Sequence, residues 1–351
     1  MALIKDYFEK TDKYIEEYGK KTIVLMQVGA FFEVYGLKKE LDQTIYRSAI
    51  EKFSKICDLN VVDKKVCVGN NGVVMAGFKE LFLEKYVKKL QDAGFTCVVF
   101  VQDEQCANTT RSLAGIFSPG TYFSCDSEVI TNNSCCIWIQ MSDSKHKIFK
   151  KENGKKRVYV GVSCIDIYTG KSILMEFNQI YINNPTTFDE LERFISIYHP
   201  SETIIIGNVS KIDLENIVQY VSIKSNLIHY ISLLESSSSS VSVNVNRALH
   251  CEKQNYQKEI FEKFFVIHDF NVFMHPFYEN CIATQSFCYL LDFIYQHNPY
   301  LIHKLQEPVF ENIGERLLLA NHSLKQLNII NDGIYQGKYS SVVSFLNQCI
   351  S

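Results

Sequence analysis

Two side chains near the N-terminus, Phe31 and Glu33, have the spacing needed to act together. They follow an apolar, β-branched segment, residues 22–28, that predicts a strand and ends at Gly29. If the chain stays extended through Glu33, Phe31 and Glu33 leave one face and Phe32 points into the core, because side chains alternate along a strand. The segment then presents a flat aromatic surface beside a carboxylate that can accept hydrogen bonds.

A second set of carboxylates could support metal-dependent hydrolysis. Asp166 lies in an apolar segment that predicts a strand, and a helix predicted over 188–198 carries Asp189, Glu190 and Glu192. Nucleases use such groups to hold two metal ions. However, Glu190 and Glu192 face apart on a helix, and the sequence Asp-Ile-Tyr-Thr-Gly that begins at Asp166 suits a turn whose Asp accepts bonds from backbone N–H groups. We favour the turn and keep a nuclease as an alternative.

Other familiar chemical sites are missing from the sequence. The segment from Gly333 to Lys338 has three residues between its glycines, and Tyr339 follows the lysine, whereas a Walker A loop needs four residues and then Ser or Thr. The nine His form no metal-binding pattern, and the 12 Cys contain no C-x-x-C pair. We therefore expect no catalytic residue, no metal site and no cofactor in this chain, and reduced thiols in an intracellular protein.

The composition is that of an ordinary folded protein. Of the 351 residues, 46% are hydrophobic and 21% are charged, which excludes collagen-like, mucin-like and disordered classes. The formal net charge is −3, so any contact with nucleic acid would depend on local placement of Lys and Arg. No apolar run approaches the roughly 18–20 residues that span a bilayer, and we expect no membrane partner.

The pattern of apolar residues predicts a multidomain α/β protein with three regions. Residues 1–122 combine strands with amphipathic helices, including a helix predicted over 41–57, and form a mixed α/β domain. Residues 123–247 form a second α/β domain that closes with the Ser-rich run 236–240, interpreted as a linker. Residues 248–351 show mostly helical spacing that stops inside an apolar stripe, so we expect a truncated helical domain.

Several motifs resemble, in the same order, those of MutS-type DNA mismatch repair proteins. They are Gln27–Tyr35, Gly72–Phe78, Ser118–Thr121, Val160–Gly170, Glu190–Arg193, His199–Glu202 and Leu317–Leu327. The resemblance covers nearly the whole chain. The chain is similar to the N-terminal part of a divergent family member. It implies a mismatch-recognition domain at 1–122, an RNase H-like connector domain at 123–247, and the start of a helical core or lever domain at 248–351.

The resemblance also implies roles for single residues. By position, Phe31 corresponds to the phenylalanine that enters the DNA minor groove and stacks on a mispaired or unpaired base. Such insertion is least costly where pairing is already defective, so it selects weak sites without reading sequence. Glu33 would accept a hydrogen bond from the base, and Lys20, Lys21 and Arg47 are candidate phosphate contacts.

The implied partners are double-stranded DNA with mismatches or small loops, a MutL-like protein bound through the connector, and a second copy in the full-length protein. ATP and Mg²⁺ would bind only in a C-terminal part beyond Ser351, so this chain is not expected to be an enzyme by itself. A third interpretation is a non-catalytic platform for partners, with Phe31 buried and no preference for mismatches. Whether the compartment is nucleus, cytoplasm or an organelle stays open.

Overall fold

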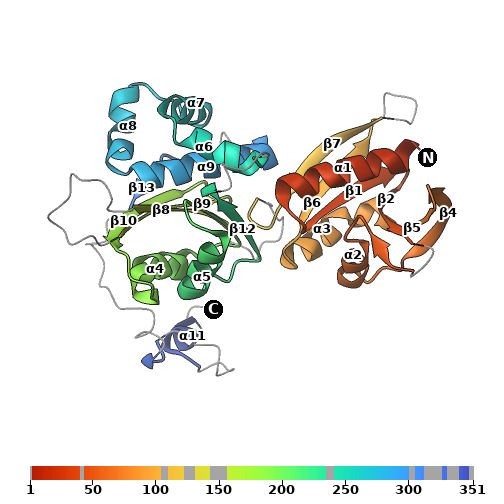
Figure 1. The fold of residues 1–351 in the computed structure, drawn as a ribbon, viewed down its shortest axis with the longest axis horizontal. Helices are drawn as coiled ribbons and strands as arrows, with labels where there is room; N and C mark the ends of the chain where they lie inside the picture. Colours follow the sequence, from red (N-terminus) through yellow and green to blue (C-terminus); the bar gives the residue numbers. More distant parts are fainter. Residues whose placement is uncertain are drawn as a thin grey trace.

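The computed structural model describes residues 2–39, 43–103, 110–121, 131–142, 156–234, 241–299, 305–311, 326–329 and 340–347. These residues form two α/β bodies joined side by side (Figure 1). The N-terminal domain comprises residues 2–121, and the second domain comprises residues 131–311. The Ser-rich run 236–240, most of the motif at 317–327 and the glycines at 333 and 337 lie outside the described residues.

The N-terminal domain is built on a seven-stranded mixed sheet with the order β4-β5-β2-β1-β6-β7, and β3 pairs with β2. Its strands are β1 (Thr22–Val28), β2 (Phe31–Lys38), β3 (Ile45–Tyr46), β4 (Val62–Val68), β5 (Asn71–Lys79), β6 (Thr96–Gln102) and β7 (Arg111–Phe117). Its helices are α1 (Ala2–Tyr18), α2 (Ile50–Cys57) and α3 (Leu83–Asp92), with a 3-10 turn η1 (Glu80–Phe82) before α3. Only β1 and β6 are parallel neighbours, and the remaining pairs are antiparallel.

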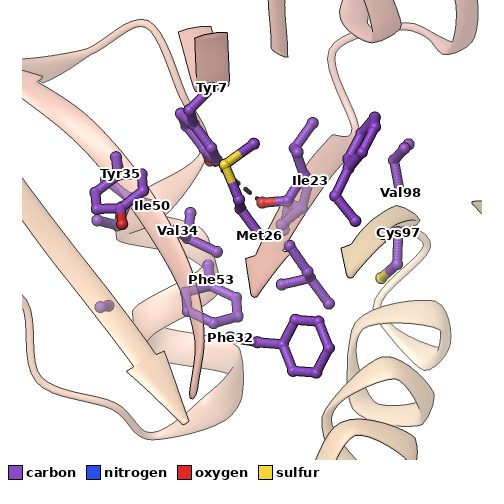
Figure 2. Close-up of a cluster of buried hydrophobic side chains, with 14 of the residues drawn as sticks. Tyr7, Ile23, Met26, Phe32, Val34, Tyr35, Ile50, Phe53, Cys97 and Val98 are labelled. Carbon is purple, nitrogen blue, oxygen red and sulfur yellow. Dashed lines mark hydrogen bonds between the residues drawn. The ribbon is translucent and has the colours of Figure 1, made fainter. Parts of the chain in front are cut away.

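Helices cover both faces of this sheet because the central strands are apolar on both sides. Helix α1 places Tyr7 against one face, where its hydroxyl donates to the Val24 carbonyl at 3.3 Å. Figure 2 shows Tyr7 on one side of β1 and Phe32 with Phe53 of α2 on the other. Phe32 is 1% exposed, which fits its predicted place in the core. A core on both faces holds the strands rigidly, which suits a scaffold for an exposed hairpin.

Two local predictions in this domain need correction. The helix predicted over 41–57 begins only at Ile50, because residues 45 and 46 form the short strand β3, which pairs with β2. Strand β7 was not predicted, since it is an edge strand whose side chains are largely exposed and therefore lack apolar alternation. The sequence also predicts a hairpin with its turn at residues 70–72 and a strand over 95–102, and β4 with β5 and β6 confirm both.

The second domain contains a six-stranded sheet with the order β12-β11-β8-β9-β10-β13. Its strands are β8 (Asn133–Ser142), β9 (Arg157–Asp166), β10 (Ser172–Ile180), β11 (Glu202–Gly207), β12 (Leu227–Ser232) and β13 (Val309–Phe310). The first three form an antiparallel meander, and β11 and β12 run parallel to β8. The sheet is mixed, as the α/β expectation for this region requires.

Helices pack on both faces of the second sheet as well (Figure 1). They are α4 (Asp189–Tyr198), preceded by the 3-10 turn η3 (Pro185–Phe188), α5 (Lys211–Val221), α6 (Val243–Cys251), α7 (Gln254–Phe264), α8 (Phe270–Glu279) and α9 (Cys281–His297); a last helix, α11 (Val342–Asn347), lies near the C-terminus. The helices α4 and α5 cover one face, and α6 to α9 cover the other with a shared apolar core. Helix α6 therefore crosses residue 247, and the helices α6 to α9 are packed onto the second sheet. In the part of the chain that the structure describes, no helix has both the length and the apolar character to cross a bilayer.

Helix α9 begins directly against the sheet at Gly161 of β9. The Glu176 carboxylate accepts from the backbone N–H groups of Ile282 and Ala283 at 2.9 and 3.0 Å, which caps the helix. A Cβ atom on Gly161 would lie 2.2 Å from the Ala283 nitrogen and 2.3 Å from the Ile282 carbonyl carbon. The first turn of α9 can approach the sheet this closely only because residue 161 has no side chain.

Gly161→Ala is therefore expected to lower the free energy of unfolding by about 3 kcal/mol or more, the upper end of the usual cost of overpacking. Chemical denaturation of the two proteins measures the difference. Gly72→Ala is the matched control, because nothing lies within 4 Å of a Cβ atom there. Equal destabilisation by the two substitutions would contradict the close contact at Gly161.

The two domains are joined by a buried carboxylate at the start of β11. Glu202 is 1% exposed and accepts from the Ser118 hydroxyl at 2.5 Å and the Gly120 N–H at 2.9 Å, both in the loop after β7. Its other oxygen lies 2.7 Å from Nε2 of His229 on β12. Burial by itself would raise the pKa of Glu202, but the bonds from His229 and Ser118 favour the carboxylate and lower its pKa overall. Two of the quoted motifs thus meet at this carboxylate.

A second contact between the domains involves the C-terminal ends of α1 and α9. The ring of Tyr18 meets the ring of His297 edge-on, with centroids 5.0 Å apart. Arg247 of α6 lies between two carboxylates, 3.6 Å from Glu17 and 3.2 Å from Asp292. The N-terminal domain is therefore attached through apolar, hydrogen-bonded and ionic contacts at two separate places.

Candidate nucleic-acid interface

The turn between β1 and β2 presents Phe31 to solvent. Phe31 pairs with Val28 across the hairpin and is 45% exposed. Neighbouring segments hold the turn on both sides: the Gly29 N–H donates to Oε1 of Gln102 at 3.0 Å, and the Ala30 carbonyl accepts from the Glu80 N–H at 2.9 Å. A large apolar ring is thus fixed at the surface by a rigid backbone, as a stacking side chain requires.

Glu33 lies on the same face as Phe31, as strand alternation predicted, but it is not free. The residue is 8% exposed, and its Oε2 atom is 2.5 Å from Nζ of Lys64 on β4. The hydroxyl of Tyr35 also donates to this oxygen. Burial, together with the adjacent Glu33 carboxylate, raises the pKa of Tyr35, so Tyr35 stays a neutral donor. Strand alternation thus predicts the face on which Glu33 lies but not the partners that hold it.

Within the motif Gly72–Phe78, the structure explains why residue 77 is a glycine. Gly77 pairs with Glu33 across β2 and β5. A Cβ atom on Gly77 would lie 2.6 Å from the Phe32 carbonyl oxygen and 3.3 Å from Cγ of Glu33. The missing side chain leaves room for the Glu33 carboxylate to lie over β5 towards Lys64.

Several exposed side chains beside Phe31 were missed by sequence analysis. Lys79 pairs with Phe31 across β2 and β5, and the next turn exposes Leu81 and Phe82 by 90% and 47%. On the other side of the hairpin, Arg111 donates from Nε to the Gln27 carbonyl at 2.7 Å. No local pattern gave the position of Lys79, because it depends on the pairing of β2 with β5, which the sequence did not predict.

The predicted phosphate contacts lie away from this end of the sheet. Lys20 and Lys21 precede β1, whereas Phe31 follows its last residue, so seven residues of strand, about 23 Å, separate them. Arg47 follows β3, which pairs with the opposite end of β2, and it is ion-paired with Asp12 at 2.6 Å. That pairing raises the pKa of Arg47. The structure brings Phe31 and Glu33 together and does not bring Lys20, Lys21 or Arg47 to them.

Asp166, the centre of the nuclease alternative, is engaged in the turn after β9. Its carboxylate accepts from the N–H groups of Asn132 and Tyr168 at 3.0 and 3.1 Å and from the Thr169 hydroxyl at 2.6 Å. Within the described ranges, no three His, Cys, Asp or Glu side chains are grouped so that they could hold a metal ion. These contacts favour the turn-capping role over metal-dependent hydrolysis.

Comparison with known proteins agrees with this geometry. The family profile described as MutS domain I matches residues 8–126, a range that contains the hairpin, Phe31, Glu33 and Lys64. Residues 8–126 are a MutS domain I.

The rest of the chain matches MutS homologues as well. It is 25% identical to a putative DNA mismatch repair protein mutS homolog of Acanthamoeba polyphaga mimivirus, over 97% of this chain and 31% of that protein. It is 22% identical to a mitochondrial DNA mismatch repair protein mutS homolog of Sarcophyton glaucum, over 98% of this chain and 36% of that protein. A DNA mismatch repair protein MutS of Fervidobacterium nodosum is 26% identical over 59% of the chain.

The chain thus corresponds to the N-terminal part of a MutS-type protein, with domain I followed by a second α/β unit and helices. It spans 31% and 36% of the length of the two relatives that it matches almost throughout.

Proposed function

We propose that this chain recognises mispaired or unpaired bases in double-stranded DNA as part of DNA mismatch repair. The observation that carries the proposal is the fixed, exposed ring of Phe31 beside the fully buried Phe32. In this proposal Phe31 enters the minor groove as a wedge and stacks on the defective base while the DNA bends. Glu33, two residues along the same face, accepts a hydrogen bond from the base. The names of the relatives, which are mismatch repair proteins, support the same role.

The wedge discriminates through the cost of deforming DNA. Unstacking a base step costs a few kcal/mol, and this cost is smallest at a mismatch or an unpaired base. Stacking on an aromatic ring returns about 1–3 kcal/mol per base. A matched duplex must meet the full cost of unstacking, so it is bound less tightly at the wedge. Recognition then depends on deformability and not on base sequence.

The test is the affinity at low salt for a duplex with one G·T mismatch or one unpaired T, compared with the matched duplex. Wild type is expected to prefer the defective duplexes, and Phe31→Ala is expected to lose that preference. Loss of the stacking ring should lower the affinity for the defective duplexes by roughly 5- to 150-fold. Phe82→Ala, which removes another exposed ring of the same domain, serves as the control and should retain the preference. Equal binding of matched and mismatched duplexes by wild type would contradict the proposal.

The remaining roles concern the whole protein. We propose that this chain does not itself catalyse a reaction and that ATP and Mg²⁺ act in regions of its relatives outside the matched third. A MutL-like partner would bind the connector, and the full-length protein would act on DNA as a dimer. The platform alternative requires a buried Phe31, and the exposed ring favours the wedge over it.

A further inference from the structure

The carboxylate proposed to contact the base is held by a cation that could itself bind DNA. Nζ of Lys64 lies 2.5 Å from Oε2 of Glu33 and 2.9 Å from the hydroxyl of Tyr35. The ammonium also lies 4.5 Å from the centre of the Tyr35 ring, in a cation–π contact. Tyr35 is fixed in turn by an edge-on contact with Tyr7, at 4.9 Å between centroids. Lys64 therefore has a defined position in the DNA-free protein.

An irregular edge strand makes this contact possible. Strand β4 is at the edge of the sheet, and its register with β5 shifts between Asp63 and Cys67. Within the shifted stretch, Lys65 adopts a positive φ of 53°. Such bulges twist a strand and redirect its side chains. Here Lys64 extends across β5 to the carboxylate on β2.

Lys64 and Glu33 lie on the face and at the end of the sheet that carry Phe31. Glu33 is two residues from Phe31, about 7 Å along the strand. The Lys64 side chain keeps 25% of its surface exposed, so its ammonium is accessible to a second anion. Phosphate oxygens and carboxylate oxygens both accept hydrogen bonds from a lysine ammonium. Lys64 carries a single positive charge, so it can neutralise either Glu33 or a phosphate, but not both.

We propose that Glu33 masks Lys64 in the free protein and releases it when a defective base engages the carboxylate. The inference rests on the proposed function of Glu33. A matched duplex resists unstacking, so no displaced base reaches Glu33, and Lys64 stays paired and gives no phosphate contact. A mismatch draws the carboxylate to the base, and the ammonium then binds the DNA backbone. The ion pair thus converts recognition of a base into one additional contact with phosphate.

The masking has a measurable signature in the salt dependence of binding. Each lysine–phosphate contact adds about 0.9 to the slope of log affinity against log salt concentration. Wild type is expected to show a slope steeper by about one for the mismatched than for the matched duplex, and Lys64→Met is expected to abolish this difference.

Glu33→Gln removes the mask and is expected to raise the affinity for the matched duplex several-fold. In the double variant with Lys64→Met this gain should disappear. Lys79→Met is the matched control, because Lys79 lies opposite Phe31 and forms no ion pair with any described residue. It should lower the affinity for both duplexes equally. The thermal transition of each variant verifies that it is folded.

Two results would overturn the masking. One is an equal gain from Glu33→Gln with and without Lys64→Met, which would mean that the carboxylate acts on phosphates directly. The other is a wild-type protein that prefers the mismatched duplex but shows the same salt slope for both duplexes. The gain on the matched duplex requires no mismatch, so it still tests the masking if wild type shows no mismatch preference and the proposed function fails.

Discussion

Replacement of Glu202 by Ala is expected to lower the free energy of unfolding by about 3–5 kcal/mol, the usual cost of removing one partner of a buried ionic network. The substitution leaves the Ser118 hydroxyl, the Gly120 N–H and His229 without the carboxylate that now accepts from them. Because these groups belong to both domains, the N-terminal domain should also begin to unfold separately. Denaturant titration followed by circular dichroism measures both effects.

Glu262→Ala is the control for this experiment. Glu262 forms an exposed pair with Lys258, both side chains being 51% exposed, and such pairs contribute about 0.3–0.5 kcal/mol. A Glu202→Ala protein with the stability of the Glu262→Ala protein would show that the buried carboxylate does not hold the domains together.

The stability of the protein is expected to fall as the pH drops from about 6.5 towards 4, because His297 is buried in its neutral form. Burial lowers the pKa of His297 from 6.5 to about 4. The unfolded chain takes up the proton below about pH 6.5 and the folded chain only near pH 4, so stability is complete above this window and is lost within it. The total loss is about 3 kcal/mol, from 1.36 kcal/mol for each unit of pKa difference.

His297→Phe should remove most of this pH dependence. A phenyl ring can keep the contacts with Tyr18 and Phe293, whose rings lie 5.0 and 4.0 Å from that of His297. The free energy of unfolding of wild type, His297→Phe and the exposed-site control His268→Gln would be measured between pH 7 and 4.5. The pKa of Glu202 is lowered from its ordinary value of 4.5, so Glu202 changes the stability only below pH 4.5, outside the measured range. A slope that persists in His297→Phe would contradict the assignment to His297.

Local sequence patterns predicted those elements whose apolar side chains repeat along the chain. The strands predicted over 95–102 and 158–167 are largely buried, and they match β6 and β9 to within one residue; for the third region only helical spacing was predicted, without helix bounds. The edge strand β7 was missed because its solvent-facing residues carry no such repeat. The helix α5 and the strand β12 were not predicted either. Periodicity thus identifies elements through burial, and it fails at edges.

The site could be predicted only as far as strand alternation reaches. Alternation assigned Phe31 and Glu33 to one face and Phe32 to the other. The pairing of Glu33 with Lys64 joins residues 31 positions apart through two strand pairings and a register shift. No local pattern contains that information. The same limit explains why Lys20, Lys21 and Arg47 could be named as candidate phosphate contacts without any prediction of their distance from Phe31.

Helix α9 has a mechanical consequence. It is capped on the second sheet by Glu176 at one end and contacts Tyr18 of the N-terminal domain through His297 at the other. Its 17 residues span about 26 Å. Thirteen of these residues are buried, so α9 is held along the second sheet and not only at its capped end. The contact between His297 and Tyr18 therefore ties the domain that carries Phe31 to that sheet through a rigid rod.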